Sequence, residues 1–193
     1  MTKSQTAEAN NGGIAVNNNG GEVSVTITAL SKVTSILNPL LIKIIEAYKP
    51  EESIDGEIVD YLGVDEKLEY NAVAAYAEDI REYSGYMGLI EALIESIDNE
   101  DPGAKSRFLW AIQQKYKQAK KELLIEGSIR TTNKSEIFEF IKNNSDRILL
   151  KVSKLIDETF EGFDGATIEI VHSAKELIVC YGFINCKILE PPK

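Results

Sequence analysis

Residues 99–125 read NEDPGAKSRFLWAIQQKYKQAKKELLI and carry the clearest structural pattern in this chain of 193 residues. Pro102 and Gly103 form a stop signal, and after them apolar residues recur three and four positions apart. This spacing predicts a helix over residues 104–126. The stripe that we expect to be buried consists of Leu109, Ile112, Tyr116, Ala119 and Leu123. The helix therefore has one side that belongs to a core.

The opposite side of this predicted helix is basic. At about 100° per residue, five side chains gather there: Arg107, Trp110, Gln114, Lys117 and Lys121. The segment holds six of the 21 basic residues of the chain, and the only tryptophan lies among them. Tryptophan and arginine are enriched at the centres of protein interfaces. We predict that these five residues contact a protein partner, with packing of Trp110 under a neighbouring helix as the alternative.

The overall charge argues against several classes of partner. The chain has 31 acidic and 21 basic residues, a formal net charge of -10. Such a surface repels nucleic acid and anionic membranes. No segment is apolar enough to span a bilayer, and the N-terminus lacks the apolar core of a signal peptide. We therefore expect a cytoplasmic protein without membrane contact, and nucleic acid is only an alternative ligand for the basic face.

The remaining sequence predicts a mainly α fold, a domain of five to seven helices. Apolar residues recur at helical spacing in seven segments. These segments are residues 29–48, 66–84, 85–97, 104–126, 136–144, 145–160 and 168–186. Pro39 either kinks the first helix or opens a new one at Asn38. Residues 166–171 contain TIEIV, which favours a strand, but the apolar spacing from Val171 onward favours the helix that we expect.

The N-terminal residues differ in composition from the rest. Residues 1–28 are rich in Asn and Gly and form a short β-prone arm, in which Val23, Val25 and Ile27 alternate with polar residues. A lone hairpin is marginal in water. We therefore expect these three residues to form a self-association arm through a hairpin between subunits. The predicted domains are this arm (1–28), a helical domain (29–127) and a smaller helical C-terminal subdomain packed on it (128–193).

Candidate catalytic and metal-binding residues are few. His172 is the only histidine, and Cys180 follows eight residues later. That separation is about two helical turns, too far for direct contact on one helix. No Cys-x-x-Cys spacing and no phosphate-binding Gly-Lys-Ser/Thr pattern occurs. We therefore expect no enzymatic activity, no cofactor and no metal.

Two segments resemble a known family. Residues 69–124, which contain DPGAKSRFL at 101–109, and residues 177–192, LIVCYGFINCKILEPP, resemble the C-terminal module of bacterial ABC-three-component systems. The likeness covers residues 29–192. It implies a bacterial conflict or antiphage setting, in which such a domain mediates association and is joined to a variable effector. No catalytic residue of the family is carried over, because the matching positions look structural. Only the N-terminal arm stands where the effector would be, so either the chain is truncated or the effector is a separate polypeptide.

Together these features predict a non-enzymatic assembly or partner-binding subunit of a bacterial antiphage defence system. We expect it to self-associate and to bind a protein partner, an effector or another system component encoded nearby. The alternative is a sensor or regulator that binds a phage component or nucleic acid through the basic face of the helix at 104–126.

Overall fold

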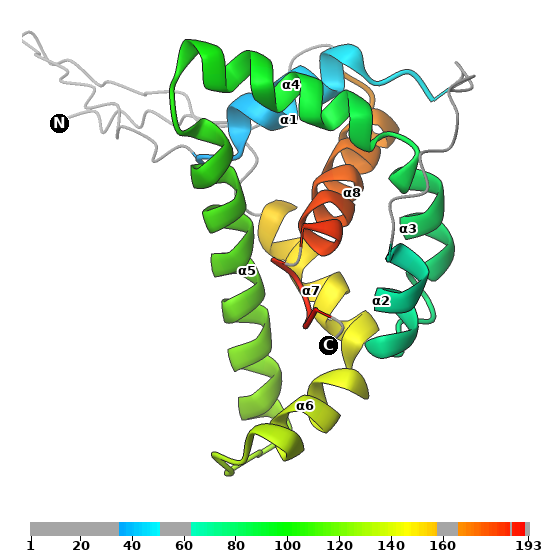
Figure 1. Cartoon of the computed structure of the whole chain (residues 1–193), viewed down its shortest axis with the longest axis vertical. Coiled ribbons are helices and arrows are strands. Elements are labelled where there is room, and N and C mark those ends of the chain that lie inside the picture. The colour runs from blue at the N-terminus through cyan, green and yellow to red at the C-terminus, as the bar shows by residue number, and fades with distance from the viewer. Residues whose placement is uncertain (1–34, 51–62, 158–165, 186, 192–193) are drawn as a thin grey trace, which may run out of the picture. The chain divides into compact units, whose positions relative to one another are not determined.

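The computed structural model describes residues 35–50, 63–157, 166–185 and 187–191, and these are mainly helical (Figure 1). The helices are α1 (Asn38–Ala47), α2 (Val64–Tyr70), α3 (Ala77–Ser84), α4 (Met87–Glu100), α5 (Ala104–Glu126), α6 (Lys134–Lys142), α7 (Ser145–Asp157) and α8 (Ile168–Ile184). The predicted mainly α fold is confirmed. Within these ranges no strand occurs. Val23, Val25 and Ile27 lie outside the described residues, so the self-association arm stays a prediction.

The predicted helix over residues 66–84 is two helices, α2 and α3. Asn71 ends α2, and Ala72 adopts a positive φ of 51°, which breaks the helical path. The freed N–H groups of Ala74 and Ala75 donate to the Asp146 carboxylate from α7 at 3.2 and 3.1 Å. Gly63 (φ 100°) precedes α2, and Asp65 lies in its first turn. This break explains why the helices number eight in the described part of the chain.

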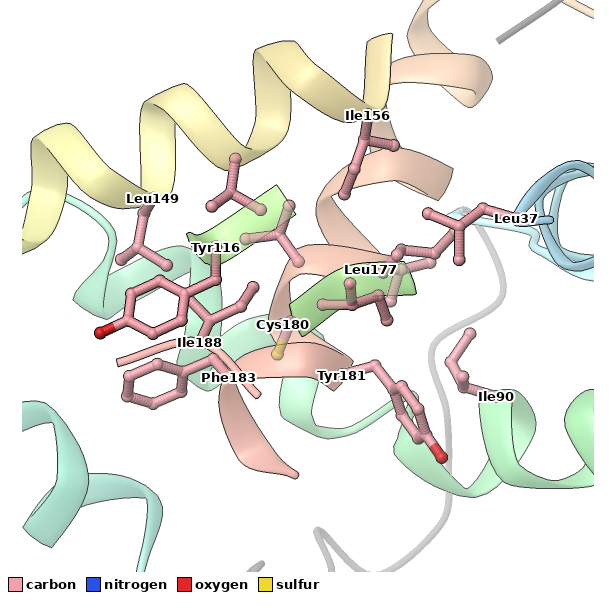
Figure 2. Packing of buried hydrophobic residues seen from close by; sticks show 14 of the residues in the cluster. Leu37, Ile90, Tyr116, Leu149, Ile156, Leu177, Cys180, Tyr181, Phe183 and Ile188 are labelled. Atoms are coloured by element: carbon pink, nitrogen blue, oxygen red, sulfur yellow. The ribbon is translucent and has the colours of Figure 1, made fainter. Parts of the chain in front are cut away.

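Helix α8 has more buried residues than any other helix of the described chain. It contacts α1, α3, α4, α5 and α7, and every residue from Glu176 to Phe183 is buried. A helix that is apolar on all sides needs partners around its whole circumference. Figure 2 shows side chains of other segments, such as Leu149 and Ile188, packed around it. The predicted helix at 168–186 is confirmed, because residues 168–171 continue it and form no strand.

Gly182 lets α8 approach its neighbours closely. A Cβ atom at this position would lie 2.5 Å from Ile112 Cγ2 on α5 and 3.0 Å from Ile188 Cδ1. Ile112 and Ile188 are both fully buried. The chain then turns back, and the Lys187 and Ile188 N–H groups donate to the Gly182 carbonyl at 2.9 and 3.2 Å. The C-terminal residues thus form part of the core.

Helix α5 has the predicted bounds, but its buried stripe differs at one position. The buried residues are Ala104, Phe108, Ile112, Tyr116, Ala119 and Leu123. The prediction chose Leu109, which is only partly buried, in place of Phe108. Phe108 lies four residues before Ile112 and continues the stripe toward α4, which contacts α5.

The predicted boundary at residue 127/128 separates elements that share a core. Helices α7 and α8 of the predicted C-terminal subdomain contact α5 of the predicted helical domain. All eight helices belong to one compact unit, Thr34–Lys193. The two-domain division itself stays a prediction. None of the helices in the described ranges is long and apolar enough to cross a bilayer.

We predict that Gly182→Ala destabilises the fold by about 1–3 kcal/mol, because the added methyl group overlaps Ile112. Urea unfolding followed by circular dichroism measures the loss. Gly88→Ala on α4 is the matched control, since no atom lies within 4 Å of its Cβ position. That control should be neutral or stabilising by up to about 1 kcal/mol. Equal unfolding midpoints for both variants would contradict the close approach of α8.

Candidate partner-binding surface

The predicted basic residues of α5 point away from the helices that pack on it. Helices α4, α7 and α8 contact α5 and lie on the same side of it (Figure 1). Trp110 is 55% exposed, so it does not pack under a neighbouring helix, which was the alternative. Lys117 and Lys121 are exposed and Gln114 is partly exposed. The outer face of α5, as we use the term, comprises Trp110, Gln113, Gln114, Lys117, Lys121, Leu124 and Ile125.

Arg107 is the predicted contact residue that has another explanation. Its guanidinium pairs with the Asp101 carboxylate and donates to the Pro102 carbonyl at 3.2 Å. Both groups belong to the turn before α5, which Gly103 (φ 88°) completes. Arg107 therefore stabilises the start of the helix. The other four predicted contact residues, Trp110, Gln114, Lys117 and Lys121, have no such structural role in the described part of the chain.

The charges of α5 are segregated because its acidic residues face α7. Lys151 on α7 binds Glu126 at 2.7 Å and Glu122 at 3.3 Å, and Arg147 binds Glu126 at 3.3 Å. Lys117 and Lys121 have no ion-pair partner among the described residues. The outer face of α5 therefore keeps an unbalanced positive charge on a chain whose net charge is -10.

Lys120 borders this face and is neutralised by the C-terminal segment. Glu190 Oε1 lies 3.4 Å from Lys120 Nζ and accepts from the Tyr116 hydroxyl at 3.3 Å. The Glu190 backbone is fixed by the Asn71 side chain, which donates to its carbonyl at 2.8 Å and accepts from its N–H at 3.2 Å. Burial, followed by the Glu190 charge, raises the pKa of Tyr116, so this phenol stays protonated and donates.

Two apolar residues of this face were absent from the sequence prediction. Ile125 is 67% exposed and Leu124 is partly exposed. Leu124, Ile125 and Ile129 line a groove of about 510 Å³ together with Lys117, Lys120 and Lys121. Continuing the helical projection past Lys121 would have placed Leu124 and Ile125 beside the lysines, so the signal was present in the sequence.

The residues considered for catalysis do not come together. His172 is exposed at the start of α8, and Cys180 is buried with its thiol 3.5 Å from the Ile80 carbonyl. Burial raises the pKa of Cys180, which disfavours the nucleophilic thiolate. No group of three or more His, Cys, Asp or Glu side chains within the described ranges could hold a metal ion.

Glu176 is the one buried carboxyl among the described residues. Burial raises its pKa, and the charges of Asp79 and Asp157 act in the same direction. The Ser153 hydroxyl, which donates to Glu176 Oε1 at 2.6 Å, and nearby His172 oppose this shift. The group joins α7 to α8 in the interior and lies apart from the outer face of α5.

Comparisons with family models, curated proteins and solved structures found no match to this chain.

We predict that Glu176→Gln makes folding stability less dependent on pH. The raised pKa means that the folded state holds the proton more tightly, so the free energy of unfolding falls as pH rises from the ordinary carboxyl pKa through the raised one. Gln keeps an acceptor for the Ser153 hydroxyl but does not titrate, so the free energy of unfolding no longer falls with pH on account of this residue. The stability of the variant relative to the parent should therefore rise as pH increases from about 4, the ordinary carboxyl pKa, measured by urea unfolding at a series of pH values. Exposed Glu95→Gln is the control, and parallel profiles for the Glu176 variant and the parent would refute the prediction.

Proposed function

We propose that this chain is a non-enzymatic partner-binding subunit that recognises another protein through the outer face of α5. The observation that carries the proposal is the exposure of Trp110 on the same face as Lys117 and Lys121, which have no ion-pair partner among the described residues. Helix α5 already buries a complete apolar stripe, so the fold does not need an indole on the other side. Covering the exposed half of the ring, about 100 Å², would contribute about 2–3 kcal/mol. A bound protein supplies that cover.

The defence setting of the proposal rests on the family resemblance. Several of the residues that carry this likeness have structural roles in this chain. In DPGAKSRFL, Arg107 holds the turn and Phe108 is buried. In the closing segment, Ile188 and Leu189 are buried. The role that the likeness implies is association, and the partner would be an effector or another component encoded nearby. Self-association of the subunit belongs to the same proposal.

The alternative ligand is nucleic acid or a phage component, with the chain as a sensor or regulator. Two lysines on one face that lack an ion-pair partner in the described ranges favour it, but the chain is strongly acidic, and Arg107 is engaged elsewhere. Phosphate binding releases counterions, so affinity for an oligonucleotide would fall steeply with salt.

We predict that the double substitution Trp110→Ala/Lys117→Ala weakens association at least about thirtyfold, because truncating an interface hot spot costs about 2 kcal/mol or more. Association is measured as recovery of the natural partner in pull-downs from the source cells, and light scattering of the purified chain reports separately whether the same face also joins two copies. Helicity should be unchanged, because both side chains lie off the core.

The control for this experiment is Leu150→Ala/Lys154→Ala on α7, which removes another exposed apolar residue and an exposed lysine. It should leave association intact. The proposal is wrong if the α5 variant keeps both the parental mass and the parental recovery of partner.

A further inference from the structure

The outer face of α5 has apolar side chains at its two ends and cations between them. Trp110 is 55% exposed at one end and Ile125 is 67% exposed at the other. They are fifteen residues apart, about 22 Å along the helix. Lys117 and Lys121 project between them on the same side. A complementary partner has to offer apolar contacts over this length and negative charge in the middle.

The C-terminal half of the face is hollowed. The groove of about 510 Å³ has apolar walls from Tyr116, Leu124 and Ile129, and its lysines are Lys117, Lys120 and Lys121. Apolar side chains can enter such a groove while the lysines bind acidic groups around them. The groove therefore extends the recognition surface beyond α5 itself to the residues that follow it.

A carboxylate of the chain itself is already bound at the edge of this groove. Glu190 accepts a hydrogen bond from Tyr116 and pairs with Lys120. This contact shows that the edge of the groove can bind a carboxylate next to apolar side chains. Lys117 and Lys121 carry the same charge without any such partner in the described part of the chain.

Resting on the proposed function, we infer that the partner docks an acidic amphipathic helix along the outer face of α5. The face is a helix surface, so it presents no free strand edge to which an extended peptide could add by backbone pairing. A docked helix satisfies its own backbone groups and needs only side-chain contacts. Its apolar side chains cover Trp110 and Ile125, and its Asp or Glu side chains bind Lys117 and Lys121.

The test is a selection from a displayed library of random peptides of roughly 16 residues, the helical length that spans the face, on the immobilised full chain. We expect the enriched peptides to combine Asp or Glu with apolar residues at helical spacing. Trp110 is the only tryptophan, so its emission should shift to the blue and resist acrylamide quenching when such a peptide binds. Lys117→Glu/Lys121→Glu keeps this reporter and should weaken binding at least about tenfold, whereas Lys154→Glu on α7 should not.

Several results would overturn the inference. They are enrichment of neutral or basic peptides, no enrichment at all, unchanged affinity in the charge-reversed variant, or an oligonucleotide that protects Trp110 in place of the peptide. Self-association of the purified chain through this face would also overturn it, because the occupant would then be a second copy. One of these results could occur while Trp110→Ala/Lys117→Ala still loses the natural partner. In that case the acidic helix is not the docked element, but the proposed function stands. If that variant also has no effect, both are wrong.

Discussion

The close approach of α8 to α5 at Gly182 is the constraint on which the rest of the structure depends. Ile112 of α5 occupies the space that a Cβ atom at Gly182 would need. Because residues 176–183 of α8 are all buried, α5 can cover only one flank of this stretch, and the other neighbours of α8 are α1, α3, α4 and α7. Helix α5 consequently uses one stripe for the core. Its remaining surface is left for charge and for Trp110.

Helix ends near such a core need partners for their free backbone groups, and the chain supplies them from distant segments. Asp146 accepts from the N–H groups that precede α3. Asn71 binds the backbone of Glu190, and Ser145 donates to the Asn71 carbonyl. These contacts join residues more than 70 positions apart. They also explain why local spacing predicted one helix over residues 66–84, since no local signal reports a carboxylate that arrives from α7.

The bounds of α5 could be predicted because its signals are local. Pro102 and Gly103 precede it, Gly127 follows it, and its apolar spacing is regular. The same projection placed Trp110, Gln114, Lys117 and Lys121 on the side away from the core. It could not show that Arg107 is used by the preceding turn, or that Glu122 and Glu126 are neutralised by α7, because charge pairing between elements depends on tertiary structure. Ile125 lies on the same side in this projection, about one turn beyond Lys121.

The pairing of Lys120 with Glu190 decides where the positive charge of the outer face is concentrated. The Asn71 side chain, which is fully buried, donates one hydrogen bond to the Glu190 backbone and accepts another from it, so the Glu190 carboxylate stays beside Lys120. Lys120 Nζ also lies over the Tyr116 ring, so this lysine packs on the tyrosine and adds little unbalanced charge to the surface. The unbalanced charge then falls on Lys117 and Lys121, midway between the two exposed apolar ends. The segment that carries Glu190 is anchored because Ile188 and Leu189 are buried in the core. Ile188 packs against Gly182, where a larger residue would not fit. The packing of the core therefore determines the charge pattern of the surface.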